Sequence, residues 1–193
     1  MAASDSYVET EVKIRVPDGA DAARALIERQ GYPLIDARTL ECDQLFDRDG
    51  ELRRSGRILR LRKIGQRAIA TYKGPALSET ETEQRYKQRE EVEFDVSNAD
   101  AFQRMLERLG YAPRFRYEKF RTKFATPGEA GVISIDETPI GVYLELEGTP
   151  AWIDRTAAQL GLSPKEYLTM SYGSVYQEYR RAHPNAPEDM IFA

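Results

Sequence analysis

The sequence has little of the chemistry on which many enzymes depend. Its 193 residues contain one histidine, His183, and one cysteine, Cys42. A disulfide framework, a Cys/His zinc site and a histidine-based nucleophile triad are therefore nearly excluded. Any catalysis has to use carboxylates, amines, guanidiniums, hydroxyls and, if needed, a hard metal ion.

Other features are missing as well. No apolar run approaches the roughly 18–20 residues that span a bilayer, and the N-terminus lacks the basic and apolar regions of a signal peptide. The 28 Lys+Arg are outnumbered by 32 Asp+Glu, and the formal net charge of −4 argues against non-specific nucleic-acid binding. We therefore expect a cytoplasmic protein with no membrane or nucleic-acid partner, and one free thiol fits a reducing compartment.

The size and composition favour one packed domain. Hydrophobic residues make up 41% of the chain, which is enough to build a core. We expect a single domain over residues 1–180 and a C-terminal tail over 181–193, with His183 solvated in the tail. The sequence leaves open whether the protein is a monomer or a homodimer.

Alternation of charged and apolar residues predicts most of the secondary structure. In residues 7–16, Val12 and Ile14 alternate with Glu11 and Lys13, which is the period of a β-strand. The same pattern predicts strands near 40–46, 57–63, 67–73, 91–96, 115–124, 131–136 and 142–147. Helices are predicted at 20–30, from about 98 to 110, at 152–160, just after Ser163 and at 172–182. Residues 74–89 show no periodicity and are predicted to form a polar loop.

Two parts of the chain resemble each other. Residues 11–16 align with 91–96, and the helices that follow both end in a Gly-Tyr pair, Gly31-Tyr32 and Gly110-Tyr111. We interpret this as an internal repeat of residues 7–73 and 89–147. Two strand–helix–strand halves favour one pseudo-symmetric domain over two independent ones.

The charged faces of the strands point to a common interior. One strand with a charged face usually turns that face to water, but here at least seven strands repeat the pattern. Helices need the apolar faces, so the charges must lie on the other side. Seven or eight antiparallel strands can then close into a barrel with a charged lumen. The acids expected there are Glu9, Glu11, Glu91, Glu93, Asp136, Glu145 and Glu147. The bases are Lys13, Arg15, Arg60, Arg62, Lys73, Lys119, Arg121 and Lys123.

Such a lumen suits a particular ligand. Uncompensated buried ions cost several kcal/mol each, and a polyanion together with a divalent cation would offset that cost. Carboxylates coordinate Mg²⁺ or Mn²⁺, while Lys and Arg bind phosphate oxygens. The sequence has no Gly-x-x-x-x-Gly-Lys-Ser/Thr loop. The pattern therefore predicts metal-assisted reaction of a polyphosphate.

These residues also resemble a known family. Residues 9–13, Glu-Thr-Glu-Val-Lys, are similar to the Glu-x-Glu-x-Lys signature of the CYTH, or triphosphate tunnel metalloenzyme, superfamily. Matching blocks follow in order at Asp43, 46–47, 59–62, 71–75, 89–93, 118–121, Asp136, 141–147 and 171–172. The resemblance implies an α+β fold, with a closed antiparallel eight-stranded β-barrel, the triphosphate tunnel, and helices packed outside.

The resemblance also implies roles. Glu9, Glu11 and Glu147 would bind one divalent cation, and Asp136 and Glu145 a second. Glu91 and Glu93 would lie in or near the metal shells. The triphosphate would be held by Lys13, Arg60, Arg62, Lys73, Lys119 and Arg121. Lys13 or a metal held by Glu9 and Glu11 would activate the attacking group. Many relatives carry a basic residue where this chain has Met170, so one phosphate contact is missing or is supplied elsewhere, by Lys165 or Arg180.

Three functions remain open on this basis. The superfamily includes class IV adenylyl cyclases, thiamine triphosphatases and inorganic triphosphatases. Hydrolysis of ATP, thiamine triphosphate or tripolyphosphate demands least of the site, because it needs no adenine pocket. Conversion of ATP to cyclic AMP and pyrophosphate is the close alternative, and a non-catalytic nucleotide- or polyphosphate-binding module is the third. The full carboxylate set argues against the module, since anion binding needs only the bases.

Overall fold

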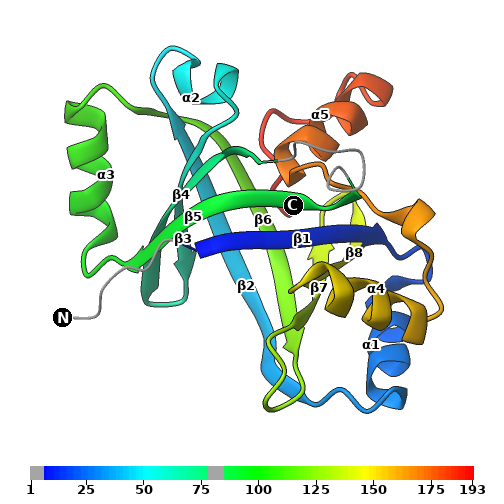
Figure 1. The fold of residues 1–193 in the computed structure, drawn as a ribbon. Helices are drawn as coiled ribbons and strands as arrows, with labels where there is room; N and C mark the ends of the chain where they lie inside the picture. Colours follow the sequence, from blue (N-terminus) through cyan, green and yellow to red (C-terminus); the bar gives the residue numbers. More distant parts are fainter. Residues whose placement is uncertain (1–6, 78–84) are drawn as a thin grey trace.

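The computed structural model describes residues 7–77 and 85–193, and its centre is a closed antiparallel β-barrel (Figure 1). The eight strands are β1 (Tyr7–Arg15), β2 (Leu34–Asp47), β3 (Ile58–Ile64), β4 (Arg67–Ala76), β5 (Lys87–Asp95), β6 (Ala112–Phe124), β7 (Val132–Thr138) and β8 (Gly141–Glu147). The helices are α1 (Gly19–Arg29), α2 (Glu51–Arg54), α3 (Ala99–Arg108), α4 (Pro150–Gln159), the 3-10 helix η2 (Pro164–Glu166) and α5 (Tyr172–Ala182). The predicted fold class is confirmed.

The strand order has an internal symmetry. Around the barrel the strands follow the order β1-β5-β4-β3-β2-β6-β7-β8. Exchanging β1 to β4 with β5 to β8 reproduces the same cyclic order, read in the opposite direction. This topology accommodates the repeat of residues 7–73 and 89–147, which itself stays a prediction.

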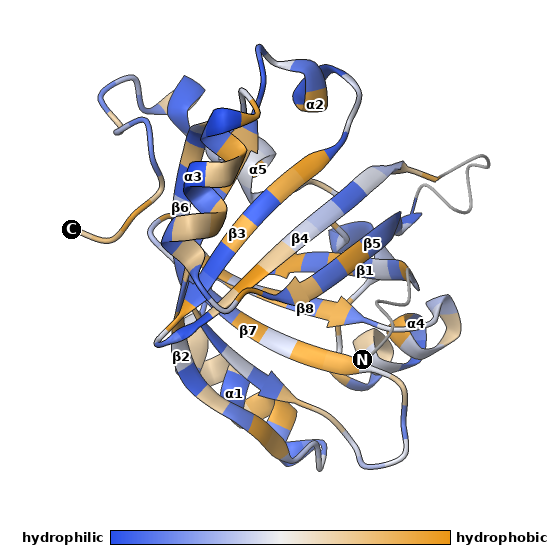
Figure 2. Ribbon diagram, turned by 90° about the vertical axis from the view of Figure 1, so that its left-hand side faces the viewer, coloured by the Kyte–Doolittle hydropathy of each residue, from blue (hydrophilic) through white to orange (hydrophobic). Residues whose placement is uncertain are grey.

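Helices cover the apolar faces of the strands. Helices α1 and α4 pack on β1, β7 and β8 through a cluster that includes Ile14, Ile27, Ile135 and Ile153. Leu106 of α3 packs with Phe46 and Leu61 on the opposite side (Figure 1). Blue and orange segments alternate along β3 and β5 in Figure 2, as expected for strands with one charged and one apolar face. The outward apolar residues therefore anchor the helices, and the charged residues are left for the lumen.

Non-strand segments complete the barrel wall near α5. The backbones of Leu168 and Lys13 exchange two hydrogen bonds, of 2.9 and 2.8 Å. Met190 pairs in parallel with Tyr117 of β6 and is 1% exposed. Part of the predicted C-terminal tail therefore lies docked against β6. His183 is exposed, as predicted, and stacks on Tyr179 with ring centroids 4.0 Å apart.

The structure differs from the sequence prediction in further places, one of them the start of β2, which begins at Leu34 and not near residue 40. Residues 51–54 form the short helix α2, which is not among the predicted helices. Asp47 stabilises its start by accepting hydrogen bonds from the backbone N–H groups of Leu52 and Arg53. Strand β5 begins at Lys87, inside the predicted polar loop. The acidic part of that loop, residues 79–83, lies outside the described residues. None of the described helices has the length and apolarity that a membrane span requires.

Trp152 is a packing residue. It is 5% exposed on α4, and its indole N–H donates to Glu129 at 2.6 Å. Its ring also lies directly over Gly131, where an added Cβ would approach the ring to 2.1 Å. The segment that leads into β7 can therefore pass beneath the indole only because residue 131 has no side chain.

We expect Gly131→Ala to lower the free energy of unfolding by about 1–3 kcal/mol, because overpacking displaces the indole. Urea denaturation followed by circular dichroism measures this. Gly74→Ala is a matched control, because the nearest described atom to its Cβ would be the Glu90 Cβ, at 3.5 Å. Equal stability of the two variants would contradict the close approach of Trp152.

Candidate functional site

The barrel lumen contains a charged cavity of about 280 Å³. Twelve of the thirteen side chains proposed from the sequence as metal, phosphate or catalytic groups line it: Glu9, Glu11, Lys13, Arg60, Arg62, Lys73, Glu91, Glu93, Lys119, Arg121, Glu145 and Glu147. The thirteenth, Asp136, is fully buried behind Lys119 and Arg121. The barrel therefore brings the whole proposed set together, although Glu93 lies at its edge with a side chain 40% exposed. The prediction that Arg15 faces the lumen is wrong, because this residue is exposed and does not line the cavity.

Strand register explains this convergence. Residues directly opposite each other in an antiparallel pair project to the same face of the sheet. Glu11 of β1 lies opposite Glu147 of β8 and opposite Lys87 of β5. Lys13 lies opposite Glu145 in the same way. The residues of β5 and β8 that lie opposite the inward residues of β1 therefore also point into the lumen. Each of these β1 side chains faces charged side chains from the adjacent strands.

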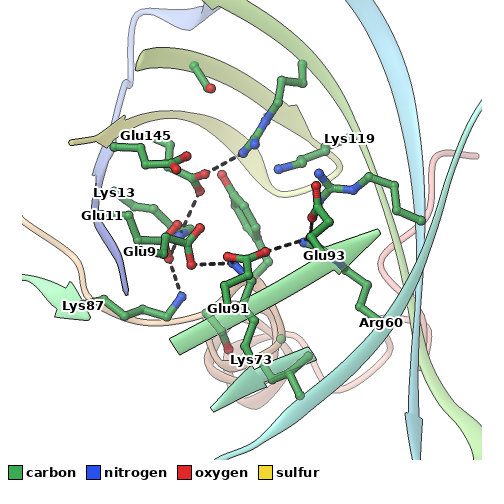
Figure 3. A pocket seen from close by; sticks show the side chains of 18 of the residues that line it. Glu9, Glu11, Lys13, Arg60, Lys73, Lys87, Glu91, Glu93, Lys119 and Glu145 are labelled. Atoms are coloured by element: carbon green, nitrogen blue, oxygen red, sulfur yellow. Dashed lines mark hydrogen bonds and ion pairs between the residues drawn. The ribbon is translucent and has the colours of Figure 1, made fainter. Parts of the chain in front are cut away.

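At one end of the lumen, carboxylates alternate with lysines (Figure 3). Lys13 Nζ lies 2.9 Å from carboxylate oxygens of both Glu11 and Glu145. Lys73 Nζ lies 2.5 Å from Glu9 and 2.9 Å from Glu91. These contacts come from four different strands, so the ion pairs cross-link the barrel.

At the other end of the lumen, the buried carboxylate of Asp136 is surrounded by more bases than acids. Asp136 accepts hydrogen bonds from Arg121, from Lys119 at 2.8 Å and from the Tyr172 hydroxyl at 2.6 Å. The α5 residue Tyr172 thereby inserts its ring into the lumen, with the ammonium groups of Lys13 and Lys119 5.1 and 5.0 Å from its centre. Buried charges at this end are neutralised within the protein.

A second group of side chains extends the base-rich end. Arg62 contacts Asp43 at 2.8 Å and Glu41 at 3.0 Å, and Arg60 contacts Asp43 at 3.4 Å. Glu41 and Asp43 are buried. Their carboxylates hold the two guanidiniums in place, so that these point into the lumen.

The carboxylates near Glu147 are not fully compensated. Within the described ranges, Glu147 lies within 4.0 Å of no base, and burial together with repulsion from Glu9, Glu145 and Glu11 raises its pKa to about 7. Burial, opposed by Lys73 but reinforced by Glu9, also raises the pKa of Glu91 to about 7. Glu91 Oε2, although near Lys73, has no partner in hydrogen-bond geometry in the described part of the chain. This end of the lumen has a local excess of negative charge.

Two lysines that share Glu11 have opposite electrostatic environments. Burial disfavours the charge on Lys13, but its ion pairs with Glu11 and Glu145 prevail and hold its pKa well above the ordinary value. Burial, with repulsion from Lys13 and Lys73, instead lowers the pKa of Lys87 to about 8, despite its contact with Glu11. Lys13 therefore retains its proton firmly, which suits anion binding better than proton abstraction.

The donor set fits a hard divalent cation. Glu9, Glu11, Glu91 and Glu147 supply only oxygen donors, and these are the ligands that Mg²⁺ and Mn²⁺ prefer. In the described part of the chain, no three such side chains gather closely enough to enclose an ion, because lysines lie between the carboxylates. The uncompensated charge at Glu147 and the orphaned Glu91 oxygen are what a cation at this end would neutralise.

Sequence reasoning missed several lining residues. Lys87 was assigned to a loop because residues 74–89 lack alternation, although its parity with Glu91 is a usable signal once the strand is extended. Tyr117 also lines the cavity. Neither of the two suggested replacements for a base at Met170, Lys165 and Arg180, lines this cavity. Arg180 lines a second cavity that adjoins it, and Lys165 does not.

Comparisons with known proteins agree with this geometry. A family model described as CYTH domain matches residues 8–172. The Methanocaldococcus jannaschii protein named "Putative adenylate cyclase MJ0240" is 26% identical over 141 residues, which cover 72% of this chain and 76% of that protein.

Solved structures share the fold at low identity. The Pyrococcus horikoshii OT3 protein PH1819 superposes with a TM-score of 0.74 at 20% identity, covering 89% of this chain and 99% of that one. The Hippeastrum protein named "Putative adenylyl cyclase HpAC1", described as having a dominant triphosphatase activity, gives a TM-score of 0.63 at 18% identity and covers 89% and 96%. At these sequence identities the structural similarity shows a shared fold and nothing about the reaction.

Asp136→Ala should lower the free energy of unfolding by about 3–5 kcal/mol, because it leaves Lys119 and Arg121 as buried cations without their main partner. Chemical denaturation measures the loss. Asp95→Ala, which removes the exposed pair with Arg67, is the control and should change stability by less than about 1 kcal/mol. A small effect of Asp136→Ala would show that the lumen tolerates unpaired bases.

Proposed function

The chain belongs to the CYTH domain family, and we propose that it is a divalent-metal-dependent enzyme that hydrolyses a triphosphate and releases phosphate. The observation that carries this proposal is the lumen itself. An excess of carboxylates at one end and a set of lysines and arginines along the rest share one cavity of about 280 Å³. The first suits a cation and the second suits phosphate oxygens.

The bases would bind and orient the triphosphate. Lys13, Lys73, Lys119, Arg60, Arg62 and Arg121 all present their charged groups to the cavity. In the structure these groups are paired with carboxylates, so a bound polyanion has to compete with internal partners. Neutralising the carboxylates with a cation weakens that competition, and cation and triphosphate should therefore bind cooperatively.

The carboxylates around Glu147 would hold the cation. Glu147 and Glu91 fit this role because their charge is the least compensated. Glu11 lies opposite Glu147 in the sheet, and Glu9 and Glu11 line the same cavity. Asp136 fits it less well, since two bases and Tyr172 already occupy its oxygens. A bound Mg²⁺ or Mn²⁺ supplies charge stabilisation to the phosphoryl group and lowers the pKa of water.

Lys87 is the better placed of the two lysines to exchange a proton. Its pKa of about 8 lies near neutral pH, whereas Lys13 stays charged. We assign Lys13 to phosphate binding and the deprotonated form of Lys87, the minority form at neutral pH, to accepting the proton of the attacking water. Hydrolysis of this kind needs in-line attack and electrostatic stabilisation, with no covalent side-chain intermediate.

Cyclisation of ATP is the second candidate. The relative from Methanocaldococcus jannaschii carries an adenylate cyclase name, and a cyclase would use the same cation and phosphate groups. It would also need a place for adenine and a positioned ribose hydroxyl, while the lining of the lumen cavity is mainly ionic. Fold membership does not determine the reaction.

A product assay separates these functions. The protein is incubated with Mg²⁺ or Mn²⁺ and with ATP, thiamine triphosphate or tripolyphosphate, and the products are resolved by ion-exchange chromatography. We expect orthophosphate from at least one substrate, and loss of the activity in excess EDTA. Cyclic AMP with pyrophosphate would identify a cyclase. Binding of a triphosphate without any product would favour the non-catalytic module.

Glu9→Gln and Glu147→Gln should each lower turnover at least about 100-fold, the typical scale for lost electrostatic stabilisation. Glu137→Gln is a matched control, because Glu137 lies on β7 and pairs with Arg38 outside the lumen. Steady-state phosphate release measures all three. Wild-type activity in both lumen variants would contradict the assignment of the cation site.

A further inference from the structure

A second cavity adjoins the lumen. It has a volume of about 510 Å³ and lies between α2, the start of β3, the start of β6 and α5. Leu45, Ile58, Ser171 and Gly173 line both cavities. The second cavity therefore opens at the end of the lumen that α5 covers, and a ligand long enough can occupy both.

The second cavity is rich in arginine, and we call it the arginine cavity. Its lining includes Arg53, Arg57, Arg89, Arg114 and Arg180. Five guanidiniums face two carboxylates there, those of Asp47 and Glu188. Both oxygens of Asp47 already accept backbone hydrogen bonds at the start of α2. The cavity thus has an excess of three positive charges.

These arginines differ from the lumen bases in how they are paired. Each of the six bases proposed to hold the triphosphate contacts a carboxylate within 4.0 Å. In the arginine cavity, only Arg57 does so within the described ranges, with Glu51 at 3.4 Å. The lumen bases are thus compensated by carboxylates, whereas the arginine cavity has more guanidiniums than carboxylates.

Arg89 connects the two spaces. It stands on β5 opposite Glu9, on the strand face that points inward. Its guanidinium nevertheless reaches into the arginine cavity, where one N–H donates to the Gly56 carbonyl at 3.3 Å. Among the residues that the structure describes, the buried Nε has no hydrogen-bond partner. An unsatisfied buried donor of this kind is costly unless a ligand accepts from it.

The apolar part of the lining strengthens the effect. Leu52, Leu59 and Phe115 lie beside the guanidiniums. Low-dielectric walls focus the field of the charges and make a charge-assisted hydrogen bond stronger than it is in water. The ligand that fits is an anion with several phosphate-like groups.

We propose that the arginine cavity binds the phosphates of a linear inorganic polyphosphate that extend beyond the three held in the lumen. This rests on the proposed hydrolytic function and names its substrate as a chain longer than triphosphate. Water oxygen would bond to the terminal phosphorus in the lumen, and the bridging oxygen would leave with a chain one phosphate shorter. A nucleoside fits less well, because its base and ribose bring no negative charge to the unpaired arginines.

The test compares equilibrium binding of tripolyphosphate, of ATP and of a size-fractionated medium-chain polyphosphate by calorimetry, in EDTA and without divalent cation. The variant is Arg114→Gln/Arg180→Gln. The matched control is Arg104→Gln/Arg108→Gln, which removes two exposed arginines from α3 on another face. We expect the cavity variant to weaken medium-chain binding about tenfold, and tripolyphosphate binding much less, since two charge-assisted contacts are lost. The control should leave both affinities unchanged.

Other outcomes would overturn the proposal. Equal weakening of both ligands would show a general charge effect, and no weakening of the medium chain would show that the cavity does not bind it. Selective weakening of ATP binding would assign the cavity to a nucleoside. If the cavity variant selectively loses the medium chain while the wild type hydrolyses nothing, the binding proposal stands and the hydrolytic function fails. If the wild type hydrolyses tripolyphosphate while the variant binds the medium chain as the wild type does, the hydrolytic function stands and the binding proposal fails.

Discussion

The structure depends on the pairing of buried charges inside a closed barrel. Glu11, Lys13, Lys119, Asp136 and Glu145 are at most 6% exposed. Removing such ions from water costs several kcal/mol each, and only close partners of opposite sign offset this cost. The barrel provides them, because adjacent strands in register place an acid of one strand beside a base of the next. Strand alternation, barrel closure and ion pairing are therefore mutually dependent.

The pairing is uneven, and the unevenness bears on function. Bases surround Asp136, whereas Glu147 and Glu91 lie among other carboxylates, and their pKa values rise to about 7. A folded protein would gain stability by replacing such carboxylates with neutral residues. Their presence is consistent with a cation that completes the site. The arginine cavity shows the complementary imbalance, an excess of guanidiniums at the end of the lumen near α5.

Much of this arrangement follows from local pattern. Period-two alternation predicted every strand of the barrel, and it placed Glu9, Glu11 and Lys13 on the inward face of β1. The same reasoning failed for Arg15, which shares that parity but lies at the exposed end of the strand. It failed for Lys87 in the opposite way, because β5 begins within a polar stretch that has no apolar alternation to reveal it. Parity indicates a face, but it does not indicate where a strand enters or leaves the barrel.

The sequence by itself determined which chemical groups are available to the site. Scarce histidine and cysteine left oxygen and nitrogen charges as the available groups, and alternation along each strand assigned those charges to one side. Only the tertiary structure decided which acid meets which base, that Lys87 and Tyr172 belong to the lumen, and that unpaired arginines gather in a second cavity. The physical reason is distance: alternation is a property of successive residues, whereas Coulomb energy and desolvation depend on groups that come together from distant strands.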